Sequence, residues 1–192
     1  MSTTMEQYLQ AWTRLARLAD AVPEPAWDAP SPCADWTARQ LAGHLVDGAR
    51  QVQALLQRRP PLVPVTDPTA LAKLAGDNPR AALRDAAGTV KETVADLDPG
   101  HPISTPHGPL PAEQVLAMAL TEPVVHAWDL AGATKQPVVL DDEAVATLLV
   151  GVEQVGDQLA ATGMYANALR VPDHAPPTER LLAALGRHDP RR

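Results

Sequence analysis

Residues 37–55 read TARQLAGHLVDGARQVQAL, and this stretch decides the fold class. It opens with the capping-box pattern, in which Thr37 and Gln40 satisfy each other's free backbone N–H groups at a helix start. Apolar side chains then recur at helical spacing, and His44 lies on the same stripe. Pro60 and Pro61 end the pattern. The stretch therefore predicts an amphipathic helix whose apolar face carries a histidine.

Similar periodic patterns occur along the rest of the chain. They predict further helices at about residues 4–21, 79–97, 111–131 and 141–162, and a short last helix at about 177–185. Proline-rich connections are expected at 23–32 and 60–70, a loop at 101–109, and a partly irregular tail at 163–192. No repeat or strand-rich region stands out. Helices joined by such connections predict an all-α bundle, with residues 1–192 forming a single domain.

Pro123 falls inside the helix expected at 111–131. A proline there removes one backbone hydrogen bond, and its ring clashes with the carbonyl of Ala119. The helix is therefore expected to kink near Glu122 or to be interrupted there.

Composition excludes several classes of function. The chain has 16 Lys and Arg against 23 Asp and Glu, a formal net charge of -7, which disfavours binding to nucleic acid or to an anionic membrane. Cys33 is the only cysteine, so the fold needs no intrachain disulfide. No signal peptide of ordinary form and no apolar run of about 18 residues is present. A cytoplasmic protein is expected, either a monomer or a homodimer.

Three residues could hold a metal ion. Glu122 and His126 are four residues apart, so a helix places them on one face, and His44 lies on a different helix that could face them. Two histidines and a carboxylate suit a catalytic zinc with one open position, although iron accepts the same set. Alternatively, His44 is a hydrogen-bonded core residue and Glu122 binds a backbone group freed by Pro123.

Two segments around these residues resemble a known family. Residues 32–45, PCADWTARQLAGHL, and 122–131, EPVVHAWDLA, resemble the two signatures of mycothiol-dependent maleylpyruvate isomerase-like metal-binding proteins. Residues 180–187, RLLAALGR, resemble the tail of the family's single-domain branch. The resemblance covers nearly the whole chain. It implies a DinB-like four-helix bundle with additional short helices.

By this resemblance, His44, Glu122 and His126 correspond to the family's metal triad. Zinc is the expected metal, with nickel or iron as alternatives. The family implies an open metal position for a low-molecular-weight thiol, here mycothiol, which is added or transferred to a small electrophile or assists an isomerisation. Members that isomerise maleylpyruvate carry a second domain for which this chain is too short, so maleylpyruvate itself is not the expected substrate.

Two other functions stay open from the sequence. The metal could instead catalyse a thiol-independent hydrolysis, dehydration or cyclisation through a bound water or a polarised carbonyl. The domain could also be a non-catalytic metal-binding module.

Several neighbours of the triad are candidates for supporting roles. Asp129 shares the face of His126 and could accept its second ring N–H, or bond to the start of the helix at 37–55. Asp47, one turn after His44, is a weaker candidate for the same kind of role. Cys33 is interpreted as a packing residue. Trp36 and Trp128 are interpreted as core residues that could line a pocket, and His107 as a loop residue that could border it.

Overall fold

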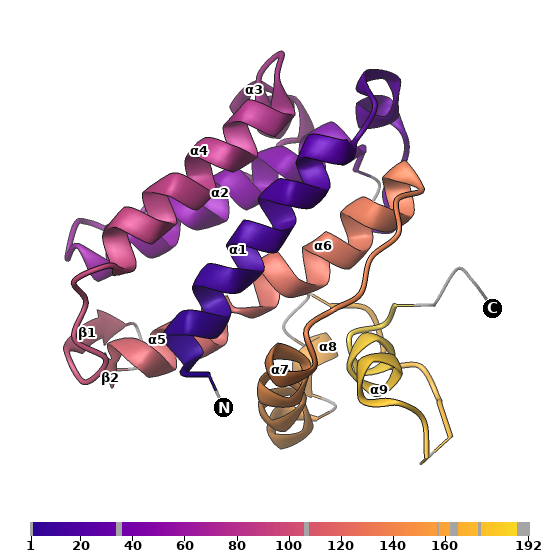
Figure 1. The fold of residues 1–192 in the computed structure, drawn as a ribbon. Coiled ribbons are helices and arrows are strands. Elements are labelled where there is room, and N and C mark those ends of the chain that lie inside the picture. The colour runs from indigo at the N-terminus through magenta and orange to yellow at the C-terminus, as the bar shows by residue number, and fades with distance from the viewer. Residues whose placement is uncertain are drawn as a thin grey trace.

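Four helices form the bundle in the computed structural model, which describes residues 2–33, 36–105, 108–156, 158–161, 165–172 and 174–187. Helices α1 and α2 each pack against both α4 and α6, which closes the bundle (Figure 1). The prediction of a helical bundle is therefore confirmed. The four helices are α1 (Thr4–Ala21), α2 (Ala38–Leu56), α4 (Pro79–Val94) and α6 (Thr121–Thr134).

Helix α2 begins where the sequence predicts. The Thr37 hydroxyl accepts the Gln40 N–H at 3.3 Å, and the Thr37 N–H donates to Gln40 Oε1 at 2.8 Å. Both bonds satisfy backbone or side-chain groups that a helix start would otherwise leave open. The apolar stripe of α2 then packs into a core of fully buried side chains from all four helices, including Trp12, Leu15, Leu41, Leu83 and Leu130.

The connection after α2 contains a helix that the sequence analysis missed. Helix α3 (Pro68–Ala75) begins inside the segment 60–70, which was expected to be irregular. Asp67 caps α3 by accepting the Ala70 N–H at 2.8 Å, and a proline is well tolerated as the first helical residue. Helix α3 lies very close to α2, because a Cβ atom added at Gly43 would stand only 1.9 Å from the Leu71 carbonyl oxygen.

The helix expected at 111–131 is interrupted, as one of the two predicted alternatives stated. It forms α5 (Ala112–Ala119) and α6, which are separated at Leu120. Pro123 is the third residue of α6, a position where a backbone N–H has no partner within its own helix. The break therefore lets the chain accommodate the proline.

The loop expected at 101–109 is instead part of an antiparallel hairpin. Strand β1 (Pro102–Thr105) pairs with β2 (Gly108–Pro111), and Ile103 stands opposite Leu110. The sequence predicts a loop here because prolines stand at both ends of the segment. Prolines are nevertheless tolerated in short edge strands. Ile103 is fully buried, so the hairpin closes one end of the core.

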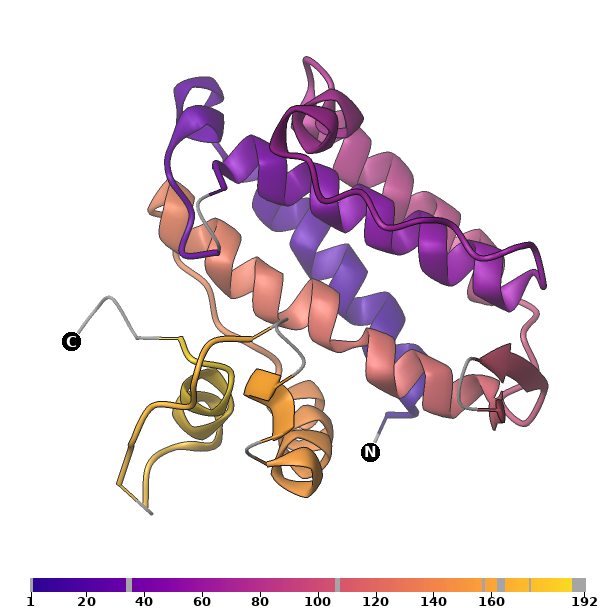
Figure 2. The same cartoon turned by 180° about the vertical axis from the view of Figure 1, so that it is seen from behind.

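The C-terminal part forms a separate group of helices beside the bundle, best seen from behind in Figure 2. It contains α7 (Asp142–Val155), α8 (Gln158–Ala161) and α9 (Pro177–Ala184), with α7 packed against α9. The helix expected at 141–162 is therefore shorter than predicted, because it ends at Gly156, whose φ of 55° breaks the helix.

A 3-10 helix, η1 (Glu24–Asp28), precedes α2. Among the described residues, no helix is long and apolar enough to cross a membrane.

Candidate metal centre

Helices α2 and α6 bring the three predicted metal ligands together. His44 projects from α2, and Glu122 and His126 lie one turn apart on α6. Glu122 Oε2 is 2.9 Å from His44 Nε2 and 3.5 Å from His126 Nε2. The two imidazole rings stand at 90° with their centroids 5.0 Å apart. The carboxylate is thus shared between two ring nitrogens from different helices.

The dimensions of this cluster fit a divalent metal ion. One ligand atom from each residue lies within 4.8 Å of the others. A zinc ion with bonds of about 2.0–2.2 Å and tetrahedral angles separates its ligands by about 3.3–3.6 Å. The observed contacts lie close to that spacing, so only small side-chain shifts would be needed to admit the ion.

An unsatisfied atom in the cluster also favours a cation. Glu122 Oε2 is buried and lies 2.9 Å from His44 Nε2, but among the described residues no donor meets it with good hydrogen-bond geometry. A buried oxygen without a partner is costly. The alternative for Glu122 requires a backbone donor, but no backbone N–H in the described part of the chain donates to this oxygen, whereas a metal ion would satisfy it.

Charges in the cluster are strongly coupled. Burial raises the pKa of Glu122, but the neighbouring imidazoles of His44 and His126 and the more distant Arg187 outweigh this effect and lower it to about 2. Burial lowers the pKa of His126, but Asp129, Cys33 and Glu122 outweigh it and raise it to about 10. Without a metal, a proton on His126 therefore neutralises part of the carboxylate charge.

Asp129 holds the other side of His126. Its Oδ2 lies 2.9 Å from His126 Nδ1, and its side chain is completely buried. Of the two roles considered for Asp129, the geometry matches contact with His126. Because Nδ1 faces this carboxylate, Nε2 faces Glu122.

Asp47 makes different contacts. Its Oδ2 accepts the Gln51 side-chain N–H at 2.6 Å and the Val65 backbone N–H at 3.0 Å. The carboxylate thus anchors the proline-rich connection that leads to α3. This arrangement assigns Asp47 to the connection rather than to His44.

The residues predicted to line a pocket do not all lie beside the cluster. The ring of Trp36 lies beside that of His44, with centroids 4.9 Å apart. Trp128 is buried and faces a different surface depression, together with Gly132 and Lys135. His107 lies outside the described residues.

Three residues near the cluster were not assigned to it from the sequence. Cys33, interpreted as a packing residue, offers its sulfur within 4.8 Å of ligand atoms of His126 and Asp129. Arg187 binds Asp129 from the C-terminal part. Tyr165 lies near enough that the carboxylate of Glu122 adds to the effect of burial in raising the pKa of the phenol. Contacts between distant segments give no local signal: Arg187 lies in the segment 180–187 that resembles the family's tail, but neither its contact with Asp129 nor the place of Tyr165 follows from a local pattern.

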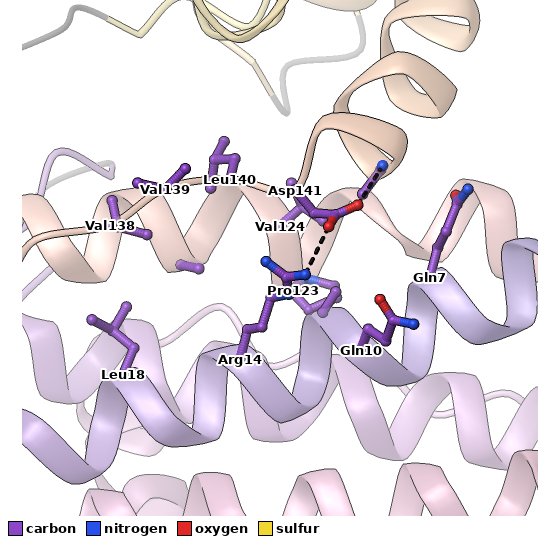
Figure 3. A pocket seen from close by; sticks show the side chains of 13 residues that line it. Gln7, Gln10, Arg14, Leu18, Pro123, Val124, Val138, Val139, Leu140 and Asp141 are labelled. Atoms are coloured by element: carbon purple, nitrogen blue, oxygen red, sulfur yellow. Dashed lines mark hydrogen bonds and ion pairs between the residues drawn. The ribbon is translucent and has the colours of Figure 1, made fainter. Parts of the chain in front are cut away.

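Pro123 points away from the cluster. Figure 3 shows it in a groove between α1 and the segment 138–141, beside the ion pair of Arg14 and Asp141, whose atoms are 2.7 Å apart. Glu122, the preceding residue, contacts His44 on α2 instead. The proline therefore packs against α1 and leaves the carboxylate free to face the histidines.

Comparison with solved structures identifies the class of fold. The crystal structure of the mycothiol-dependent maleylpyruvate isomerase aligns with a TM-score of 0.64, over 83% of this chain and 75% of that chain, at 18% sequence identity. A mutant of that enzyme aligns with a TM-score of 0.60 over the same shares. The protein therefore has the DinB-like four-helix-bundle fold of these isomerases.

Sequence comparison identifies the family. The family model described as the mycothiol maleylpyruvate isomerase N-terminal domain matches residues 8–131, which include all three members of the cluster. The uncharacterized proteins Rv0738 and MT0763 of two Mycobacterium tuberculosis strains are each 34% identical over 163 residues, 82% of this chain and 83% of theirs. The chain belongs to the mycothiol maleylpyruvate isomerase N-terminal domain family.

Proposed function

We propose that this protein is a metal-dependent enzyme that uses a low-molecular-weight thiol, mycothiol, on a small electrophilic substrate. One observation carries the proposal: the buried Glu122 Oε2 faces the Nε2 atoms of His44 and His126, at 2.9 Å and 3.5 Å. The family supports it, because its named member is a mycothiol-dependent isomerase.

In this proposal, His44, Glu122 and His126 hold the metal through two nitrogens and an oxygen. Zinc is the preferred ion, and nickel and iron accept the same donors. When bound, the metal supplies a positive charge that stabilises a thiolate, the nucleophilic form of the thiol, at neutral pH.

Other residues of the chain prepare the site. Asp129 keeps the Nδ1 side of His126 occupied, so that Nε2 stays free for the metal. Trp36 places a flat apolar surface next to His44, which would limit the access of water to one side of the site. A nearly complete ionisation of Glu122 at neutral pH supplies the negative charge that a divalent ion requires.

In the proposed reaction the thiol is the nucleophile. Its sulfur forms a bond to one carbon of an electrophilic double bond of the substrate, the π bond breaks, and the proton released by the thiol is transferred to the neighbouring atom. If the sulfur remains, the product is a thioether. If rotation about the former double bond is followed by loss of both the sulfur and that proton, the double bond re-forms in the other configuration, and the proton returns to the thiol.

Binding of the thiol to the metal tests this proposal. Zinc is replaced by cobalt(II), mycothiol is added, and the near-ultraviolet absorption is recorded. We expect a new sulfur-to-cobalt charge-transfer band, which is absent with an analogue lacking the thiol and absent in His126→Ala. A cobalt-loaded protein whose spectrum does not change with mycothiol would contradict the thiol-dependent function. Substrate turnover without any thiol would favour the metal-bound-water alternative.

A further inference from the structure

Arg187 joins the C-terminal part of the chain to the candidate metal centre. It follows α9, and its guanidinium binds Asp129 through two nitrogens, with Nε 2.9 Å from Oδ1 and Nη2 2.8 Å from Oδ2. The Asp129 side chain is fully buried, and that of Arg187 is 13% exposed. A forked contact between a guanidinium and a carboxylate fixes the plane of both groups.

The same carboxylate contacts His126. Asp129 Oδ2 lies 2.9 Å from His126 Nδ1, so one oxygen is shared between the imidazole and the guanidinium. An aspartate held by a fork cannot turn away from the imidazole. The chain of contacts therefore runs from Arg187 through Asp129 to a candidate metal ligand.

The fold of the tail places Arg187 at this point. Its backbone N–H donates to the Leu182 carbonyl at 2.8 Å, and its Nη1 donates to the Leu185 carbonyl at 3.2 Å. Gly186 has a φ of 73°, and a Cβ atom there would stand 2.6 Å from that of Ala166. The turn after α9 is thus closely packed, and it aims the guanidinium at the bundle.

We propose that Arg187 is a positioning residue, which orients His126 for metal binding by holding Asp129. The proposal rests on the metal site proposed above. It adds a role for the C-terminal part, because Arg187 lies outside the residues 8–131 that match the family model. Coupling of this kind is reciprocal, so metal binding should also stabilise the turn that carries Arg187.

Zinc affinity of single and double variants tests this role. Arg187→Met and Asp129→Asn should each weaken zinc binding by about 10–100-fold, the usual effect of losing an outer partner of a metal ligand. The double variant should bind no more weakly than Asp129→Asn alone, because both changes break one chain of contacts. Affinity is measured by competition with a chromophoric chelator.

Arg180→Met is the matched control. Arg180 lies on α9 and pairs with Glu153 of α7, so its loss perturbs the tail without touching Asp129. Zinc affinity should stay within about twofold of wild type in this control. Equal weakening by Arg180→Met and Arg187→Met would show that only the packing of the tail matters, and would overturn the proposal.

Arg187→Lys and hydrogen exchange test the same role independently of the methionine variant. Arg187→Lys keeps the charge but loses the fork, so it should bind zinc with an affinity between those of wild type and Arg187→Met, even if the methionine variant fails to fold. Hydrogen exchange at residues 185–187 should slow when zinc binds to wild type, and should not slow in Asp129→Asn. Wild type that binds no zinc would refute the proposed function, whereas zinc binding that is indifferent to Arg187→Lys would refute this inference.

Discussion

The bundle and the C-terminal part contribute different things to the candidate site. The bundle supplies all three candidate ligands, from α2 and α6, and their places follow from helical spacing along each element. The C-terminal part supplies Arg187, which reaches Asp129 across 58 residues of sequence. The spacing of Glu122 and His126 is thus set by local structure, whereas His44 and Arg187 reach α6 through the packing of segments distant in sequence.

The two regions should respond differently to substitution. Helix α6 alone places Glu122 and His126 on one face, so the pair survives changes elsewhere in the chain. The contact of Asp129 with Arg187 requires α7 and α9 to pack correctly. Changes in the bundle should therefore affect whether a metal binds, and changes in the tail how tightly it binds.

The largest effect is expected from the ligands themselves. His44→Ala and His126→Ala should each lower zinc affinity by more than the about 100-fold that the loss of an outer partner can cost. His101→Ala is the control, because His101 contacts Arg58 away from the cluster. Metal content after dialysis measures the effect. A His126→Ala protein that retained its zinc would contradict the claim that the bundle determines whether a metal binds.

Zinc affinity should also depend steeply on pH. The pKa of His126 is raised to about 10, so a proton must leave its imidazole before zinc can bind. The affinity should therefore rise about tenfold per pH unit between about pH 6.5 and 8. Chelator competition at several pH values measures the slope, and a flat profile would show that His126 is not a ligand.

The stability of the metal-free protein should depend on pH through the ionisation of His126 and Glu122. His126 has a folded pKa of about 10 against an ordinary value of 6.5, so its contribution is complete below pH 6.5 and is lost as pH rises through 10. Glu122 has a folded pKa of about 2 against 4.5, so its contribution is present above pH 4.5 and is lost as pH falls through 2. Tm should be highest between these limits, and a Tm that rises steadily above pH 7 would contradict this.

Close packing of the bundle predicts a smaller effect. Gly43→Ala would place a Cβ atom 1.9 Å from the Leu71 carbonyl oxygen, so α3 must shift. The loss of stability should be about 1–3 kcal/mol. Gly88→Ala is the matched control: apart from the neighbouring residues and backbone of its own helix, no atom of the described residues would lie within 4 Å of its Cβ atom. It should gain about 0.5–1 kcal/mol, because alanine favours a helix more than glycine does. Urea denaturation measures both, and equal effects would mean that α3 does not approach α2 closely.

The smallest effect concerns the start of α2. Thr37→Ala removes the side-chain acceptor of the Gln40 N–H and should cost about 1 kcal/mol. Thr93→Ala is a suitable control, because the Thr93 hydroxyl only donates to a carbonyl within its own helix. Its effect should stay under about 0.5 kcal/mol in the same denaturation experiment. A Thr37→Ala protein as stable as wild type would show that packing alone determines where α2 begins.

Much of the bundle could be predicted because its signals are local. The capping box at Thr37, the bounds of α1 and the break before Pro123 all follow from residues within a few positions of one another. Helix α3 and the β1–β2 hairpin were missed because their prolines resemble those of a loop. Their stability comes from burial of Leu71 and Ile103 against distant elements, which a local pattern does not reveal.

In the candidate site, too, contacts between distant segments could not be predicted from local patterns. Helical spacing paired Glu122 with His126 and made His44 a candidate on a facing helix, and the resemblance to a family assigned all three to a metal triad. The role of Asp129 was left between two alternatives, because only the three-dimensional structure shows which partner it contacts. Cys33 was interpreted as a packing residue since no basic residue is adjacent in sequence, yet folding brings it near His126.

Metal content of the purified wild-type protein tests the central claim most directly. The protein is stripped with a chelator, reconstituted with zinc and freed of excess metal, and zinc and protein are then quantified together. Three ligands that meet at one point predict about one equivalent of zinc per chain, and less than about 0.2 equivalents in His44→Ala. A correctly folded wild-type protein that retains less than about 0.2 equivalents of zinc, nickel or iron would contradict the assignment of His44, Glu122 and His126 as a metal site.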